Sequence, residues 1–364
     1  MANKVIGNVP RIAQFLDGGS MLTPYVGSLW AALSGMGKPR PYADLLALSG
    51  AGNRLSWMPG VWNGGNCDIL SCEEPPFAPH ERVLKALGMT GTVRLARSIV
   101  GLPGPFVSEE EARLDIVRSI DAGVPVIAMG IIGPPECCAV HGYEDGGDKL
   151  IGWNYFQADE GFEAKQPFVK AHWFGSLIGY ILLEEVGEAP PERESALAAC
   201  RAIVDHAYHA DVRGAKVGLA AWETMLDQVE NATFDDCMQV LLPGPGEMWE
   251  EWAWDKTHQG RFFVYCDALC QIHERGVALP FWERMRAENP DWAEPLGEAI
   301  EAWRACSAYG GFLWKHLTMN EAGYQKFADP AIRRILAEEG RSAMALDRKA
   351  VEAVQRLIRQ REVI

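Results

Sequence analysis

Hydrophobic residues recur at helical spacing near the start of the chain and in an unbroken run further on. Residues 25–36, "YVGSLWAALSGM", place apolar side chains three and four positions apart and stop at a glycine and a proline, which predicts a helix. Residues 108–123, "SEEEARLDIVRSIDAG", predict a second helix, which Ser108 and Glu111 open as a capping box. Residues 124–132, "VPVIAMGII", have the continuous apolar character of a buried central strand.

Two further strands follow and are joined by a strong turn signal. Residues 137–143, "CCAVHGY", and residues 149–156, "KLIGWNYF", flank the segment "EDGGD". An Asp-Gly-Gly core favours a tight hairpin, because glycine and aspartate tolerate the positive φ angles that such turns need. The segment 124–156 therefore predicts three consecutive strands of one sheet.

The pattern changes at Pro190 and Pro191. Beyond them nearly every segment carries an apolar stripe of helical period, without a fixed-period repeat. The sequence therefore predicts an α+β domain over residues 1–188 and an all-α helical domain over residues 189–364. A length of 364 residues agrees with two domains, since one hydrophobic core seldom serves so long a chain.

Composition narrows the class of protein. The formal net charge is -15, and acidic residues outnumber basic ones in both halves, so neither nucleic acid nor an anionic membrane is an expected partner. The N-terminus lacks the apolar core of a signal peptide, and no apolar segment is long enough to span a bilayer. Nine cysteines at irregular spacing favour free thiols in a reducing cytoplasm.

The pair Cys137 and Cys138 stands beside Glu136 and His141 and suggests nucleophilic chemistry. Strand alternation separates these residues, however. Glu136 and Cys138 share one face, while Cys137 and His141 share the other. Cysteine is also among the residue types most often buried. The residues alone favour the wall of a core strand over a catalytic pair.

Other clusters give weaker signals. Cys266, Cys270 and His273 share one face of one helix without a fourth ligand at a familiar spacing, so a packed helix face is favoured over zinc. His206 and His209, with the aspartates beside them, predict a solvated polar helix face. Phosphate loops, zinc-protease motifs and nucleophile elbows are absent, and we expect neither a cofactor nor a metal.

The order of parts in the first half resembles a known family. The segments "GGSMLTPYVGSLWAALSGMGK", "YADLLALSGAGNRLSW" and "GPPECCAVHGYEDGGDKLIGW" are similar to the papain-like proteins related to bacteriocin-processing cysteine peptidases. They resemble especially the branch that contains butirosin biosynthesis protein H, in which a helical domain follows the papain-like one. The resemblance covers residues 15–185 and implies a papain-like fold for the first domain.

The resemblance also implies positions for a catalytic site. In this family a cysteine nucleophile begins the first helix, a histidine base begins a later strand, and an amide or carboxylate on the next strand orients that histidine. The matching positions here are Thr23, Glu136 and either Trp153 or Asn154, of which Asn154 is chemically suitable. Neither the cysteine nor the histidine is therefore present. The resemblance therefore implies the fold without its usual catalytic pair.

Three hypotheses remain. In the first, the protein keeps the cleft, has a degenerate catalytic dyad and binds a small acyl- or peptide-like compound. In the second, it is an active acyltransferase or amide hydrolase with a rebuilt nucleophile, either Thr23 with Glu136 or Cys137 with His141. In the third, the alignment is displaced, and Cys67 or Cys72 enters the cleft from a long loop. We favour the first, because a relocated nucleophile needs geometry accurate to about an ångström.

Overall fold

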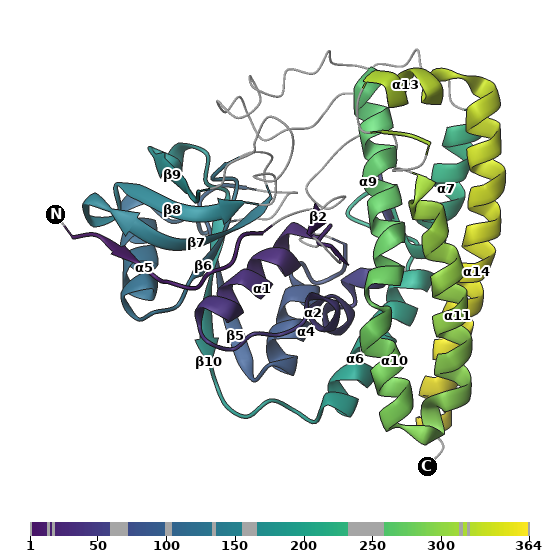
Figure 1. Cartoon of the computed structure of the whole chain (residues 1–364), viewed down its shortest axis with the longest axis horizontal. Helices are drawn as coiled ribbons and strands as arrows, with labels where there is room; N and C mark the ends of the chain where they lie inside the picture. Colours follow the sequence, from purple (N-terminus) through teal and green to yellow (C-terminus); the bar gives the residue numbers. More distant parts are fainter. Residues whose placement is uncertain are drawn as a thin grey trace. The chain divides into compact units, whose positions relative to one another are not determined.

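The computed structural model describes residues 2–12, 15–16, 19–58, 72–98, 104–132, 136–154, 166–231, 258–312, 316–318 and 321–362 (Figure 1). These residues divide into two compact units. The first unit contains residues 2–45 and 84–189, and the second contains residues 46–83 and the described residues from 190 onward. One boundary between the units, after residue 189, therefore lies at Pro190 and Pro191. The segment 46–83, which the sequence-based boundaries assign to the first domain, belongs to the second unit.

The first unit is built on an antiparallel sheet. Within the described residues this sheet has seven strands in the order β5-β10-β6-β7-β8-β9, and β1 also pairs with β7. Its strands are β1 (Lys4–Val5), β5 (Met89–Leu95), β6 (Val126–Met129), β7 (Cys137–Glu144), β8 (Lys149–Asn154), β9 (Phe168–Ala171) and β10 (Gly179–Glu185). A hairpin of β2 (Phe15–Leu16) and β3 (Gly19–Ser20), helices α1 (Pro24–Gly35) and α5 (Glu109–Asp121), and short turns η2 (Asp145–Gly147) and η4 (Trp173–Gly175) complete the described elements.

Several local predictions are confirmed in this unit. Strands β7 and β8 pair as a hairpin, and the turn between them places Asp145, Gly146 and Gly147 at positive φ. Helix α5 begins with the predicted capping box, in which the Ser108 hydroxyl accepts from the Glu111 backbone N–H. These features depend on neighbouring residues, which is why sequence patterns predict them well.

The sheet has a helix on each face, and the faces have separate cores. Cys138 and Val140 of β7 share a buried core with Ile116 of α5. Ala139 shares a different core with Ala31 of α1. Side chains of β7 therefore alternate between the α5 face and the α1 face, and the adjacent cysteines point to opposite faces, as the alternation predicted.

The second unit is mainly helical, as predicted, and α14 packs along α6, α7 and α11 (Figure 1). A small sheet in the order β11-β12-β4 adds to the helices. The elements are β4 (Ser56–Trp57), α6 (Glu192–Tyr208), β11 (Asp211–Val212), β12 (Ala215–Val217), α7 (Gly218–Asn231), α9 (His258–Val277), α10 (Leu279–Glu288), η5 (Pro290–Trp292), α11 (Ala293–Gly310), α13 (Glu321–Ala328) and α14 (Pro330–Glu362). Short element η1 (Ala51–Asn53) also belongs here, and the chain passes between the units within α2 (Tyr42–Ser49) and α4 (Ala78–Ala86).

Two buried ion pairs lie inside the second unit. The Arg275 guanidinium on α9 donates to both carboxylate oxygens of Asp347 on α14, at 2.8 and 2.7 Å. The Trp222 indole N–H donates to the same carboxylate at 2.8 Å. Arg54 donates to Glu274 at 2.7 Å, and its side chain is 2% exposed. Such charges are tolerated in a core because each has a charged partner and further hydrogen bonds.

The same network holds the segment that contains β4. Arg275 donates to the backbone carbonyl oxygens of Asn53 and Arg54, both at 3.2 Å. The backbone N–H of Ser56 donates to the Gln271 side chain at 3.0 Å. Residues 46–58 are thus part of the helical unit because polar side chains far away in the sequence bind their backbone. Local sequence patterns could not predict to which unit these residues belong.

Helices α9 and α11 approach closely at Gly310. A Cβ atom at this position would lie 2.6 Å from both the Leu269 carbonyl oxygen and the His273 backbone nitrogen. Backbone atoms cannot move aside as a flexible side chain can, so Gly310→Ala is expected to destabilise the protein by about 1–3 kcal/mol. Urea unfolding followed by circular dichroism measures this loss of unfolding free energy.

Gly297→Ala is the matched control on the same helix. A Cβ atom there would meet the guanidinium group of Arg286 at 3.0 Å, and this flexible group can move. Alanine also has about 1 kcal/mol higher helix propensity than glycine, so the control is expected to be neutral or stabilising. Equal effects of the two substitutions would contradict the close helix contact.

Candidate functional site

Thr23 lies immediately before α1, at the position where the resemblance places a nucleophile. Its backbone is extended, with φ -110° and ψ 108°, and Pro24 opens the helix with a φ angle that suits it. The Thr23 residue is fully buried, and its backbone N–H donates to the Tyr42 hydroxyl at 3.0 Å. Thr23 is therefore held firmly at the helix start, within the first unit.

Helix α1 runs in the same direction as β7. Ala31 packs near Ala139 in the middle of that strand, and a Cβ on Gly35 would lie 3.2 Å from Pro125, just before β6. Because β6 and β7 are antiparallel, Pro125 marks the end of the sheet opposite to the start of β7. Thr23, about 12 Å from Ala31 along the helix axis, therefore lies at the end where β7 begins.

Glu136 and Asn154 lie at that same end of the sheet. Asn154 ends β8 and pairs directly with Cys138, so these two side chains share a face. The Gly130 N–H donates to the Glu136 carbonyl at 3.1 Å, which extends the β6–β7 ladder to Glu136. Alternation then places Glu136 with Cys138, on the α5 face of the sheet, whereas α1 and Thr23 lie on the other face.

Asn154 has a structural partner. Its side-chain amide donates to the Ile132 carbonyl oxygen at 2.7 Å, and the residue is 3% exposed. This bond ties the end of β8 to the segment that follows β6. Glu136 is buried as well, with 5% of its surface exposed. The pairing of β7 with β8 therefore places Asn154 beside Cys138, and strand alternation assigns Glu136 to the same face, opposite to α1.

Cys137 and His141 are not brought together. They stand four residues apart on one strand, which separates their Cα atoms by about 13 Å. His141 is the extra residue of a β-bulge, because Val140 and Gly142 pair with the consecutive residues Gly152 and Ile151. The His141 Nδ1 atom lies 3.2 Å from the Ile6 carbonyl oxygen. Burial lowers the pKa of His141, so its neutral form is favoured.

The thiols of the described residues are buried. Burial raises the pKa of Cys138 to about 12, and burial together with Glu73 raises the pKa of Cys72 to about 12. Thiols with such pKa values are protonated at neutral pH and are poor nucleophiles. Cys266 and Cys270 are buried on α9, as expected for a packed helix face. Cys67 lies outside the described residues.

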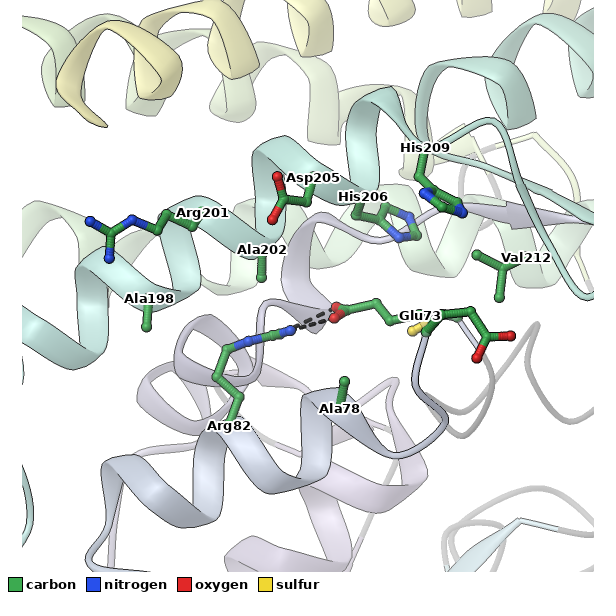
Figure 2. A pocket seen from close by; sticks show the side chains of 12 residues that line it. Glu73, Ala78, Arg82, Ala198, Arg201, Ala202, Asp205, His206, His209 and Val212 are labelled. Atoms are coloured by element: carbon green, nitrogen blue, oxygen red, sulfur yellow. Dashed lines mark hydrogen bonds and ion pairs between the residues drawn. The ribbon is translucent and has the colours of Figure 1, made fainter. Parts of the chain in front are cut away.

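A polar pocket of about 340 Å³ lies within the second unit (Figure 2). We call it the α4–α6 pocket, because residues 72–82 form one wall and residues 198–212 form the other. The two walls are more than a hundred residues apart in sequence. Helix α6 supplies its face at spacings of three and four residues, which place these side chains in neighbouring turns.

His206 lies in this pocket and corrects one sequence-based prediction. Instead of belonging to a solvated face, it is 6% exposed, and its Nε2 atom accepts a hydrogen bond from the Leu55 backbone N–H at 3.1 Å. Burial lowers its pKa, so the neutral ring is favoured. Asp205 and His209 are exposed, as predicted. The recurrence of Arg201, Asp205 and His209 at four-residue intervals was the available sequence signal for this pocket wall.

On the opposite wall, Arg82 and Glu73 form an ion pair through two contacts (Figure 2). Arg82 also donates to the Ser49 carbonyl oxygen. Glu74 is paired with Arg213 at 2.8 Å. This wall is thus close to neutral overall, because each of its two carboxylates has an arginine partner.

The described part of the chain lacks two features, a cluster of metal-binding side chains and a membrane-spanning helix. Within it, no group of three or more His, Cys, Asp and Glu side chains is arranged to hold a metal ion. Among its helices, none combines the length and apolar character needed to cross a membrane.

No protein-family model matches the sequence, and no curated protein is detectably similar to it.

Proposed function

We propose that this protein is a cytoplasmic papain-like protein with a degenerate catalytic dyad, which binds a small acyl- or peptide-like compound. The observation that carries the proposal is the position of α1. This helix begins at Thr23, at the end of the sheet where β7 begins, which is the arrangement implied by the papain-like resemblance. The compound would bind at this end of the first unit, beside the helix start and Cys137.

Binding is favoured over catalysis because the possible reacting groups are separated. Thr23 stands on the α1 side of the sheet, while alternation assigns Glu136 to the α5 side. A general base has to lie within hydrogen-bond reach of the hydroxyl that it activates. Cys137 and His141 are likewise too far apart along β7 to exchange a proton directly.

The alternative is an active acyltransferase or amide hydrolase with a rebuilt nucleophile. One observation favours it: Cys137 shares the α1 face with Ala139 and lies at the same end of the sheet as Thr23. An acyl group bound there would be close to this thiol. The alternative needs a base other than His141, and it predicts a covalent acyl-enzyme intermediate.

Covalent trapping separates the two functions. We expect no acyl adduct on Thr23, Cys137 or Cys138 when the full chain is incubated with p-nitrophenyl acetate or an N-acetyl-dipeptide thioester, because the thiols and the Thr23 side chain are buried and strand alternation assigns Glu136 to the other face of the sheet. Intact-protein and peptide mass spectrometry measure the adduct. Labelling by iodoacetamide is expected to be uniformly slow at Cys137 and Cys138 in the folded protein.

Binding is measured in parallel by ligand-observed NMR with N-acyl amino acids and N-acetyl-dipeptides. Saturable binding without turnover, weakened at least about fivefold by Thr23→Leu and unchanged by the exposed-site control Glu194→Gln, is the expected result. A stoichiometric adduct at Thr23 or Cys137 would replace this proposal by the alternative. If none of these compounds binds, the proposed function is wrong.

A further inference from the structure

The α4–α6 pocket contains one exposed row of side chains on α6. Arg201, Asp205 and His209 stand four residues apart, so they lie above one another with about 6 Å between successive Cα levels (Figure 2). Within the part of the chain that the structure describes, no ion pair or side-chain hydrogen bond joins these three residues to a partner. This row therefore offers a cation, an anion and an imidazole to a ligand.

The rest of the pocket carries little net charge. Glu73 and Glu74 are each paired with an arginine, and burial keeps Cys72 and His206 in their neutral forms. A ligand with a large net charge of either sign would meet an uncompensated like charge in the row on α6. A ligand with one positive and one negative group, and no net charge, matches this row best.

The apolar part of the pocket is lined by small side chains. Ala198 and Ala202 on α6 stand on the wall opposite Ala78 on α4 (Figure 2). A cavity of about 340 Å³ is at the low end of the range for small-molecule sites. These walls leave room for a short side chain of a small zwitterion.

We propose that the α4–α6 pocket binds a free α-amino acid, with its carboxylate against Arg201 and its ammonium group against Asp205. In such a ligand the two charged groups are attached to one carbon atom. Side chains four residues apart on a helix can converge on groups that lie so close together. The side chain of the amino acid lies against the three alanines. This site is in the second unit and is independent of the function proposed for the first.

The test is a titration of the full chain by isothermal calorimetry and thermal shift. All twenty common L-amino acids are screened first, and the best ligand is compared with two blocked derivatives, its N-acetyl form and its methyl ester. We expect saturable binding by at least one zwitterion. Each blocked derivative is expected to bind at least about tenfold more weakly, because it lacks one charged partner for the row.

Variants assign the contacts. Arg201→Gln should weaken the binding of the N-acetyl form and of the free amino acid alike, whereas Arg201→Lys should retain most of the affinity. Asp205→Asn should weaken the binding of the free amino acid about tenfold. Glu194→Gln is the matched control, since it removes one exposed carboxylate from the same helix outside the pocket. All three substituted sites are exposed, so folding is expected to survive, which circular dichroism checks.

Two results would overturn the proposal. One is that none of the twenty amino acids binds at concentrations up to about 20 mM. This limit is 20-fold above a Kd of about 1 mM, the weak end of specific small-ligand affinities. The other is binding that Asp205→Asn and Glu194→Gln change equally. Neither result bears on the acyl-binding proposal, whose readouts are Thr23 and the cysteines of β7.

Discussion

Asp347→Ala is expected to destabilise the protein by about 3–5 kcal/mol, the largest effect that we predict for a single substitution. The change leaves the buried Arg275 guanidinium without its counter-ion and removes the acceptor of the Trp222 N–H. Arg275 is 1% exposed, so water cannot replace the carboxylate. Urea unfolding followed by tryptophan fluorescence and circular dichroism measures the loss.

The matched control is Glu298→Ala, which breaks an exposed ion pair that joins α11 to α14. Its partner is Arg356 at 2.7 Å, and the two side chains are 41% and 49% exposed. Exposed pairs contribute about 0–1 kcal/mol, so this variant should stay close to the wild type. The double variant Arg275→Met with Asp347→Leu is expected to recover part of the lost stability, because no unpaired charge remains. A loss below about 1 kcal/mol for Asp347→Ala would contradict a tightly packed pair.

Mild acid is expected to destabilise the second unit through His80. This residue is 2% exposed, and burial lowers its pKa to about 3. In the unfolded chain a histidine binds a proton with a pKa near 6.5. The stability that depends on neutral His80 is therefore complete above about pH 6.5, and it is lost as the pH falls toward 3. His80 alone should account for about 2 kcal/mol between pH 7.5 and pH 5.0.

The measurement compares urea unfolding of the wild type and His80→Gln at pH 7.5 and pH 5.0. The variant has its own cost at both pH values, so the readout is the difference between them, which should shrink by about 2 kcal/mol. His172→Gln is the control, since His172 is exposed. The buried His206, whose pKa is also lowered, should supply part of the acid sensitivity that remains in the variant. An unchanged pH dependence in His80→Gln would show that its ring is not buried in the neutral form.

The faces of β7 show how one residue alters a catalytic hypothesis. Counting from the sequence assigned Cys137 and His141 to one face, and it placed Glu136 where a base would be expected. The structure keeps the alternation through Val140, and a bulge at His141 then shifts the register. Sequence patterns do not reveal such a bulge, since it depends on how two strands pair.

The pocket and the buried ion pairs could not be predicted from the sequence either, for a different reason. Arg54 and Glu274, like Glu73 and His206, are brought near each other by helix packing across long stretches of chain. A charged residue that ends up buried looks the same in the sequence as one on a solvated face. Only its partners distinguish the two cases, and those partners are distant along the chain.

The sequence by itself determined the α+β class, the helical second half, the β7–β8 hairpin, the capping box of α5 and the opposite orientation of Cys137 and Cys138. All of these depend on side chains within a few residues of one another. The tertiary structure alone decided that residues 46–83 belong to the helical unit, that His206 is buried and that α4 and α6 enclose a pocket. These features depend on burial and charge pairing between distant segments, whose free energies appear only when the chain is folded.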